Sequence, residues 1–213
     1  MNTDIPLILF AKAPIPGKVK TRLQSHCSAQ QAAYIASFLM EASIQSATRH
    51  WPGPIYLSVW LDEHHSFFET MLARYPVRMT VQPDGDLGEK MRHALHTFGY
   101  PAVVMGCDAP HTAATTYAAA FERLQQGESV IAPSDDGGYY MLGLAQPADL
   151  LFSDKPWGTA EVLSQTKQSA ITSRLSLYEL DSLNDIDEWN DLIAVLDQFG
   201  ELREYLSSEG LIL

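Results

Sequence analysis

Cysteine is scarce in this sequence: Cys27 and Cys107 are the only two among 213 residues, and they do not form a CxxC pair. Two cysteines are too few for a disulfide framework, and their spacing predicts neither a zinc site nor a redox pair. Long apolar runs are also missing, since none approaches the ~18 residues that a membrane-spanning helix needs. The first residues do not resemble a signal peptide. We therefore expect two reduced thiols, no membrane partner and a cytoplasmic location.

Basic residues are few as well, with 14 Lys and Arg against 26 Asp and Glu and a formal net charge of −12. Nonspecific nucleic-acid binding depends on basic surface that neutralises phosphates, so we expect no nucleic-acid partner. Two nucleotide-binding signatures are missing too. No GxGxxG follows a strand-like run, and the GxxxxGK[ST] spacing fails because Lys12 and Val19 replace its first glycine and its hydroxyl. A P-loop NTPase and a dinucleotide-dependent dehydrogenase are therefore disfavoured.

Four of the basic residues nevertheless lie close together near the amino terminus. Within eleven positions, and with no acidic residue between them, the sequence has Lys12, Lys18, Lys20 and Arg22. They follow the apolar run 7–10, which is typical of a fully buried parallel strand, and open α/β folds bind ligands at the carboxyl ends of such strands. Gly17 lets the backbone approach a phosphate without a Cβ in the way. The stretch predicts an anion-binding loop; the alternative is a loop of ordinary solvated lysines.

Strand-like and helix-like segments alternate along the chain, which indicates an α/β fold with a largely parallel sheet. We expect strands at 7–10, 55–61, 77–81, 102–105, 129–132, 141–145 and 175–180. We expect helices at 28–49, 64–74, 86–98, 113–126, 159–167 and about 185–196. Ser28, Asp86 and Thr159 are the expected N-caps of three of these helices. No linker or repeat divides the chain, so we expect one domain over residues 1–213, with an acidic amphipathic surface at its carboxyl end.

A second candidate site follows the strand-like run 102–105. Asp108 stands there between Gly106 and Pro110, so its carboxylate should lie at the same edge of the sheet as the basic loop. A hard cation such as Mg²⁺ or Mn²⁺ takes oxygen ligands and is commonly shared between carboxylates and substrate phosphates. Asp108 is therefore a candidate metal ligand. The alternative is that it only caps the helix that follows.

The segment 135–140 is an acidic and glycine-rich turn that contains Asp136, Gly137 and Tyr139. Two acids followed by two glycines are typical of a plain turn. The functional interpretation is a tight loop over a bound substrate, with a tyrosine as a platform for a base or a sugar.

The last acidic segment is 181–188. Asp185 with Glu188 fits a D-x-x-E cap for the helix that follows, which is the plain structural interpretation of these acids.

Taken together, these stretches resemble one family. The resemblance rests on motifs at 11–23 (AKAPIPGKVKTRL), 85–91 (GDLGEKM), 106–110 (GCDAP), 136–144 (DGGYYMLGL) and 185–187 (DID). The family is the domain of unknown function 2064 (DUF2064), also called radical-SAM/selenodomain-associated transferase 1 or arsenosugar-biosynthesis-type glycosyltransferase. It is similar to nucleotide-diphospho-sugar transferases of the GT-A fold and to nucleotidylyltransferases. Five motifs in the same order over nearly the whole chain are far more specific than any one of them.

The resemblance implies a role for each motif. The phosphate contacts would be Lys12, Gly17, Lys18, Lys20 and Arg22, of which Lys20 and Arg22 would also be catalytic. The residues that line the nucleotide would be Gly85, Asp86 and Gly88. The acceptor side would comprise Asp136, Gly137 and Tyr139, with Asp136 orienting or deprotonating the acceptor. The ligands of a divalent metal, Mg²⁺ or Mn²⁺, would be Asp108 and Asp187, or Asp185 in place of Asp187.

This sequence departs from the family pattern at two places. Family members usually have GTDCPD, whereas this chain has Cys107, Ala109 and His111 in place of the Thr, the Cys and the final Asp. The second departure is Glu188, which stands where a Thr would follow the preceding Asp. The first departure weakens any claim that a second acid beside Pro110 joins the metal.

We therefore expect a metal-dependent transferase that uses a nucleotide-activated donor, namely a glycosyltransferase acting on a small-molecule acceptor. Its partners would be a sugar nucleotide or a nucleoside triphosphate together with that acceptor. A nucleotidylyltransferase, which takes a nucleoside triphosphate and a phosphorylated small molecule and releases pyrophosphate, is the first alternative because the same loop and metal serve both reactions. A nucleotide-binding module without catalysis is the second, and the altered segment 106–111 keeps it open.

Overall fold

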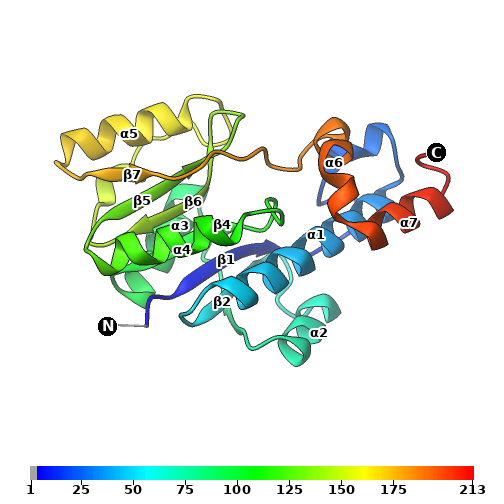
Figure 1. Ribbon diagram of the computed structural model, residues 1–213, viewed down its shortest axis with the longest axis horizontal. Helices are drawn as coiled ribbons and strands as arrows, with labels where there is room; N and C mark the ends of the chain where they lie inside the picture. Colours follow the sequence, from blue (N-terminus) through cyan, green and yellow to red (C-terminus); the bar gives the residue numbers. More distant parts are fainter. Residues whose placement is uncertain (1–3) are drawn as a thin grey trace.

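Seven strands form a central sheet in the computed structural model, which describes residues 4–213 (Figure 1). The strands are β1 (Leu7–Lys12), β2 (Ile55–Trp60), β3 (Arg78–Val81), β4 (Ala102–Gly106), β5 (Ser129–Pro133), β6 (Tyr139–Leu144) and β7 (Leu177–Glu179). Their order across the sheet is β3-β2-β1-β4-β6-β5-β7. Strand β6 runs antiparallel to β4 and β5, whereas the other paired strands run parallel. The prediction of an α/β fold with a mostly parallel sheet is confirmed.

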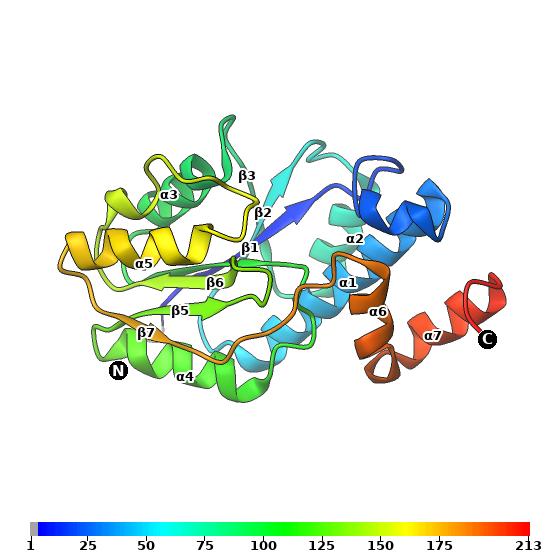
Figure 2. The same cartoon turned by 90° about the horizontal axis from the view of Figure 1, so that it is seen from above.

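Helices cover both faces of this sheet. They are α1 (Ala29–His50), α2 (Ser66–Arg74), α3 (Leu87–Phe98), α4 (Ala114–Gln125), α5 (Val162–Thr172), α6 (Trp189–Val195) and α7 (Gly200–Ser208). Three short 3-10 helices lie at Thr21–Ser25, Asp149–Leu151 and Leu196–Gln198. Figures 1 and 2 show α1 and α4 on one face and α3 and α5 on the other. Within residues 4–213, no helix combines the length and apolar character that crossing a membrane requires.

Strand β1 is buried on both of its faces, as predicted. Leu7 and Leu9 are fully buried in the cluster that includes side chains of α1, α2 and α4. Ile8, which points to the opposite face, is fully buried in the cluster that includes side chains of α3 and α5. This alternation places both layers of the core against one strand, and the loop that leaves its carboxyl end therefore starts from a rigid position.

The helix starts agree with the sequence in two cases and correct it in two others. Ser28 and Asp86 are the N-caps of α1 and α3, and both helices have a complete capping box, as predicted. Thr159 does not cap α5, because its hydroxyl donates to the carbonyl oxygen of Pro156 and the helix begins three residues later, at Val162. The Asp185–Glu188 cap is also wrong, because Glu188 itself is the N-cap of α6.

A third hydrophobic cluster lies beyond the carboxyl ends of the parallel strands, where α6 and α7 pack on the first half of α1 (Figures 1 and 2). The sequence predicted an acidic amphipathic surface here but not α7 itself, which buries Leu202 and Leu206 completely. The same cluster contains Leu23, which follows the basic stretch, and Ile186, which lies between two acids. These two buried side chains anchor the loop after β1 and the loop after β7 in the same hydrophobic cluster.

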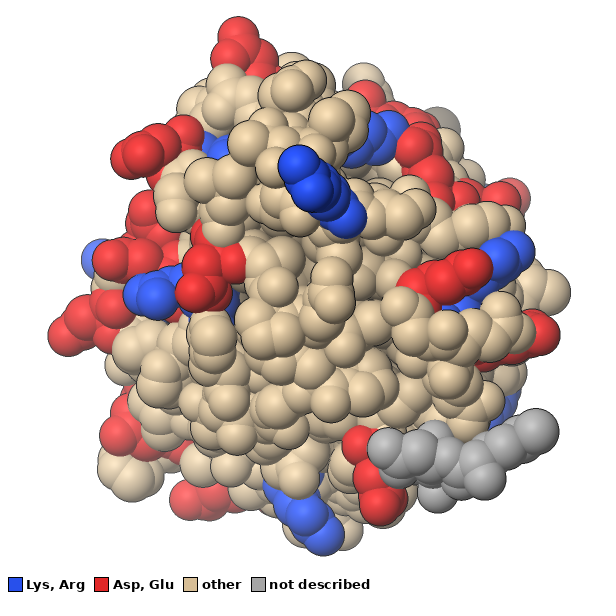
Figure 3. Space-filling model, turned by 90° about the vertical axis from the view of Figure 1, so that its left-hand side faces the viewer, with Lys and Arg blue, Asp and Glu red and all other residues tan. Residues whose placement is uncertain are grey.

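The opposite end of the molecule, where β1 begins, carries charges of both signs. On this face the Lys and Arg side chains are scattered among Asp and Glu around an area of uncharged side chains (Figure 3). The basic stretch 12–22, by contrast, follows the carboxyl end of β1. The candidate phosphate-binding residues therefore lie at the carboxyl end of β1, away from this face.

Candidate functional site

The candidate site lies at the point where the strand order reverses: β2 and β3 lie on one side of β1, and the later strands lie on the other. Strand β1 has β2 on one side and β4 on the other, and Phe10 pairs with Gly106 across β1 and β4. The loops that leave these two strands therefore begin side by side at their carboxyl ends. Open α/β sheets bind ligands at such a point, because the two loops diverge and leave a crevice.

Lys20 lies at the centre of this crevice. Its Nζ is 2.5 Å from Asp108 Oδ1 and 2.9 Å from Asp187 Oδ1, and its side chain is only 7% exposed. Burial opposes the positive charge, but the two carboxylates outweigh it and raise the pKa of Lys20. The backbone of Lys20 is left-handed, with φ of 43°, a conformation that costs energy for a residue with a Cβ and is often found at functional sites. The predicted meeting of the basic loop with Asp108 is present in this geometry.

Three of the other four predicted phosphate contacts line a cavity of about 340 Å³ beside Lys20, and Gly17 is not among its lining residues. Lys12, Lys18 and Arg22 all line it and have exposed or partly exposed side chains. Arg22 also lies 3.5 Å from Asp187 Oδ2, at a side chain that is 64% exposed. Gly17 has φ of 78° in the turn before Lys18, which is the conformation that favours glycine.

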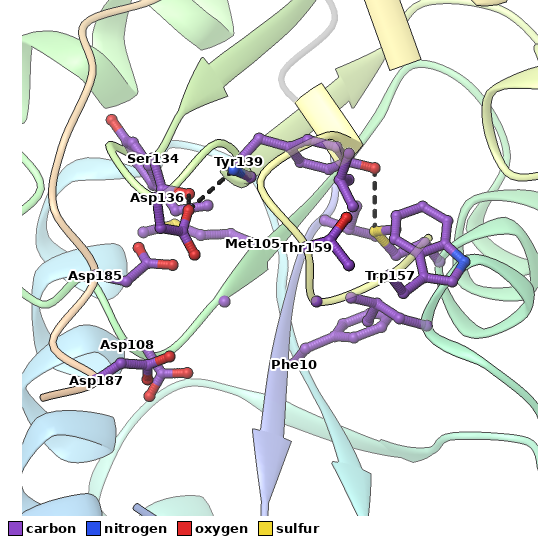
Figure 4. Close-up of a pocket in the computed structure, with 18 residues that line it drawn as sticks. Phe10, Met105, Asp108, Ser134, Asp136, Tyr139, Trp157, Thr159, Asp185 and Asp187 are labelled. Atoms are coloured by element: carbon purple, nitrogen blue, oxygen red, sulfur yellow. Dashed lines mark hydrogen bonds between the residues drawn. The ribbon is translucent and has the colours of Figure 1, made fainter. Parts of the chain in front are cut away.

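A second cavity, of about 330 Å³, lies on the other side of Asp108 and Asp187. Both cavities are lined by these two aspartates and by Phe10. In the second cavity, four aspartates lie on one side and Phe10, Thr159 and Trp157 lie on the other (Figure 4). The two cavities therefore differ in their chemistry: one is basic, and the other is partly acidic and partly apolar.

The turn between β5 and β6 brings Asp136 and Tyr139 to this second cavity, as predicted. Asp136 Oδ1 accepts hydrogen bonds from Ser134 Oγ at 2.5 Å and from the Gly138 N–H at 2.9 Å, so it stabilises the turn and lines the cavity at once. Gly137 has φ of 89°, and a Cβ there would lie 2.3 Å from the carbonyl oxygen of Ala160. Glycine is therefore required at position 137 by the turn itself. Burial raises the pKa of Tyr139, which favours its neutral phenol form.

Asp185, the weaker of the two late metal candidates, is partly buried. Its Oδ1 is buried and has no hydrogen-bond partner among the described residues. Burial is the main cause that raises the pKa of Asp185 to about 7, and the charges of Asp108, Asp136 and Asp187 raise it further. Asp187 behaves differently: burial opposes its ionisation, but Lys20 and Arg22 outweigh burial and lower its pKa.

The acidic groups around Asp108 suit a hard cation. Asp108 and Asp187 already hold one positive group, the Lys20 ammonium, between their oxygens. Asp185 adds a buried oxygen that lacks a partner within residues 4–213. In that part of the chain, no three side chains of His, Cys, Asp or Glu are grouped to hold a metal without further ligands. Two carboxylates completed by substrate phosphates are a usual arrangement for Mg²⁺, so the residues present fit such an ion.

The expected nucleotide-lining loop, Gly85 to Gly88, has a more structural role than predicted. Asp86 caps α3 and Leu87 lines the second cavity. A Cβ on Gly88 would lie 2.5 Å from the Trp157 ring, so this glycine allows α3 and the indole to pack closely. Whether Gly85, Asp86 and Gly88 contact a nucleotide stays a prediction.

Three side chains of this region were not singled out from the sequence. Phe10 and Trp157 line the second cavity, and Lys90 lies in α3 with its Nζ 3.3 Å from the centre of the Trp60 ring. Burial lowers the pKa of Lys90. A tryptophan between a proline and a glycine was the available signal for Trp157, whereas Lys90 stands inside the motif 85–91 with nothing to mark it.

Solved structures share this fold. A proposed nucleotide-diphospho-sugar transferase from Desulfovibrio desulfuricans G20 is similar over 98% of this chain and 96% of its own, with a TM-score of 0.80 and 26% sequence identity. The Rv0371c protein of Mycobacterium tuberculosis H37Rv, solved in complex with manganese, has a TM-score of 0.56 and 15% sequence identity, over 91% of this chain and 98% of its own. A 4-diphosphocytidyl-2C-methyl-D-erythritol synthase from Anaerococcus prevotii DSM 20548 has a TM-score of 0.62 and 9% sequence identity, over 93% of this chain and 97% of its own.

The last two similarities, at low identity, show the shared fold alone. Among curated proteins, no sequence matches this chain. A family model does match, over residues 43–159 and hence over more than half of the chain. The protein thus has the nucleotide-diphospho-sugar transferase fold and belongs to the DUF2064 family, described as uncharacterized proteins conserved in bacteria.

Proposed function

We propose that the protein is a metal-dependent glycosyltransferase that moves a sugar from a nucleotide-activated donor to a small-molecule acceptor. The observation that carries the proposal is the meeting of a basic cavity and an acidic, aromatic cavity at Asp108 and Asp187. A diphosphate and an acceptor need two such neighbouring sites. The similarity to the D. desulfuricans protein, whose own name proposes a nucleotide-diphospho-sugar transferase, supports the same class.

The basic cavity is where the donor diphosphate binds in this proposal. Lys12, Lys18 and Arg22 line it and are available to donate to phosphate oxygens. Each charge-assisted hydrogen bond contributes roughly 1.5 to 3 kcal/mol net. Negative charge on the diphosphate grows as the donor bond breaks, so these cations stabilise the transition state more than the bound donor.

Asp108 and Asp187 would hold a divalent cation together with phosphate oxygens of the donor. When bound, such a cation neutralises the leaving diphosphate as a Lewis acid. The manganese complex of the Rv0371c protein supports Mg²⁺ or Mn²⁺ as the ion to test first. Lys20 lies between the same two carboxylates, so its ammonium offsets their mutual repulsion and would compete with the cation for their oxygens.

Asp136 orients the acceptor in this proposal. Its Oδ1 is fixed by Ser134 and by the Gly138 N–H, so the carboxylate has one orientation at the edge of the cavity. The other oxygen, Oδ2, then accepts the proton of the acceptor hydroxyl as that hydroxyl attacks. Tyr139 lines the same cavity and offers its ring as a surface for the acceptor.

The substitution Asp108→Asn tests the proposal, because it keeps the size of the side chain and removes its charge. We expect it to abolish turnover of sugar nucleotides that depends on Mg²⁺ or Mn²⁺, while urea unfolding shows that the fold is kept. The matched control is Asp84→Asn, an exposed acid that lines neither cavity. Full activity of Asp108→Asn, with the control equal to wild type, would contradict the proposal.

Nucleotidyl transfer is the second candidate, since the erythritol synthase named above has the same fold. The basic cavity would then bind a nucleoside triphosphate, and pyrophosphate would leave. The two reactions are separated by incubating the protein with triphosphates and with sugar nucleotides, and by measuring pyrophosphate release against sugar transfer. A protein that binds these nucleotides but turns over none of them with any acceptor would be a binding module.

A further inference from the structure

The charges of the two cavities differ in a way that bears on the acceptor. The basic cavity is lined by four basic residues and two aspartates. The second cavity is lined by four aspartates, and none of the described residues that line it is Lys, Arg or His. A basic side chain that would recognise a phosphate or a carboxylate of the acceptor is thus missing from the described walls of the second cavity.

The four acids come from three separate loops and all reach the same side of the second cavity (Figure 4). Asp108 follows β4, Asp136 lies in the turn between β5 and β6, and Asp185 and Asp187 follow β7. A divalent ion held by Asp108 and Asp187 would leave Asp136 and Asp185 facing the cavity. An anion placed beside them would meet the negative charge of Asp136, and that of Asp185 when it is ionised, in a partly enclosed space where screening by water is reduced.

The other side of the second cavity is largely aromatic. Phe10 and Trp157 lie across from the aspartates, and Tyr139 lines the cavity from β6 (Figure 4). Aromatic faces bind the C–H faces of a ring or a short carbon chain, and carboxylate oxygens accept hydrogen bonds from hydroxyl or amine groups. A ligand that satisfies both sides carries several hydrogen-bond donors on one edge and an apolar face on the other.

We infer that the second cavity binds a hydroxyl-bearing acceptor without negative charge, and that phosphorylated and carboxylated acceptors are excluded. The inference rests on the proposed function and deepens it, because it selects transfer to a hydroxyl over transfer to a phosphate. In that step the acceptor oxygen forms a bond to the anomeric carbon of the donor. The bond from that carbon to the diphosphate breaks, the nucleoside diphosphate leaves with the electron pair, and the hydroxyl proton goes to Asp136.

The test uses the intact protein and matched probes: glycerol with glycerol 3-phosphate, glucose with glucosamine and glucose 6-phosphate, and uridine as a bare nucleoside. Binding is measured by saturation-transfer-difference NMR in the wild type, in Trp157→Ala and in Lys18→Ala. Signals lost in Trp157→Ala come from the second cavity. Lys18→Ala is the matched control, since Lys18 lines the basic cavity and not the second one.

We expect signals that depend on Trp157 from the uncharged or cationic probes, and at least about tenfold weaker binding of their phosphates. Binding of a phosphate as tight as that of its neutral partner would overturn the inference. Binding of uridine alone at this place would also overturn it, because the cavity would then be the nucleoside site. The absence of any signal that depends on Trp157 would overturn it as well.

Because Trp157 packs against Gly88, its loss can disturb the fold, and a second variant keeps the test sharp. Asp136→Asn retains an oxygen to accept from Ser134 and removes one charge. We expect the phosphorylated probes to bind roughly three- to tenfold more tightly to this variant and the neutral ones to bind as before. An unchanged preference would contradict the inference.

The donor side is measured separately, by the thermal shift that sugar nucleotides with Mn²⁺ produce in the wild type and in Lys18→Ala. The absence of a thermal shift with every sugar nucleotide would overturn the proposed function, whatever the probes of the second cavity show. A donor shift that depends on Lys18, together with tight binding of phosphorylated acceptors, would overturn only the inference. The two failures are therefore distinguishable.

Discussion

The backbone N–H of Ile186 donates a hydrogen bond of 3.0 Å to the carbonyl oxygen of Asp108. This bond joins the loop after β7 to the loop after β4, so Asp187 and Asp108 both reach the Lys20 ammonium. The side chain of Ile186 is fully buried in the cluster formed with α6 and α7, which also contains Leu23. The packing of these late helices thus fixes the positions of both the acidic and the basic loop.

Ile186→Ala should therefore weaken the donor site as well as the fold. Truncating a buried Ile costs about 2 to 5 kcal/mol. Leu206→Ala is the matched control, because Leu206 is equally buried in the same cluster but belongs to α7. We expect a similar loss of unfolding free energy in both variants, measured by urea denaturation, and a several-fold loss of sugar-nucleotide affinity in Ile186→Ala alone. Equal donor affinity in the two folded variants would show that the cluster only stabilises.

Replacing Lys20 by Met should destabilise the protein and make its stability depend more strongly on Mg²⁺. Removing one partner of a buried ion pair costs about 3 to 5 kcal/mol. Here the Asp108 and Asp187 side chains are 52% and 43% exposed, so water screens them. We therefore expect a smaller loss, of about 1 to 3 kcal/mol.

The carboxylates freed by Lys20→Met are then available to a cation, and binding to the native state alone raises stability. Urea denaturation with increasing MgCl₂, against a KCl series of equal ionic strength, measures this effect. We expect Mg²⁺ to stabilise the variant more than the wild type. An identical Mg²⁺ response in both proteins would mean that the ammonium and the cation do not compete for these acids.

Much of this site was predictable because it depends on local sequence. A buried strand needs a continuous apolar run, and a basic stretch that follows such a strand must emerge at the ligand-binding edge; Leu7 to Arg22 meets both conditions. The capping box at Asp86 was predictable for the same reason, since its two hydrogen bonds join residues three apart. The meeting of Lys20 with Asp108 followed from where their strands end.

The rest depends on contacts between distant residues. Helix α7 was missed because its burial comes from packing on α1 and α6, and its sequence is too polar to mark it alone. The cap at Asp185 was wrong because Asp185 is partly buried and lines the second cavity with the other acids, and Glu188 caps α6 instead. Trp157 was missed because its neighbour, Gly88, lies 69 positions away and belongs to another motif.

That contact between Gly88 and Trp157 should not tolerate a methyl group. A Cβ at position 88 would lie 2.5 Å from the Trp157 ring and 2.8 Å from the carbonyl oxygen of Phe152. Overpacking of this kind costs about 1 to 3 kcal/mol. Gly200→Ala is the control, because a Cβ there has no neighbour within 4 Å among the described residues.

We expect Gly88→Ala to lower the melting temperature and Gly200→Ala to leave it unchanged or raise it slightly, as differential scanning calorimetry would measure. The Trp157 ring must move to admit the methyl group, so binding of the acceptor probes to the second cavity should weaken too. Wild-type stability and wild-type probe binding in Gly88→Ala would show that the indole has room to adjust.

Arg22 offers the opposite case to Lys20, because its contribution should be to ligand binding and not to the fold. Its side chain is 64% exposed and lies 3.5 Å from Asp187 Oδ2, so the pair is a surface ion pair whose loss changes stability by at most about 1 kcal/mol. A contact to phosphate is charge-assisted, and losing one lowers affinity roughly 10- to 100-fold. We therefore expect Arg22→Gln to unfold at the wild-type urea concentration and to bind sugar nucleotides at least tenfold more weakly by isothermal titration calorimetry.

The control is Arg49→Gln, because Arg49 lies at the end of α1 and lines neither cavity; this variant should match the wild type in both measurements. If Arg22→Gln binds donors as the wild type does, the diphosphate does not lie beside the outer part of the basic stretch, and Lys12 and Lys18 would have to carry its recognition.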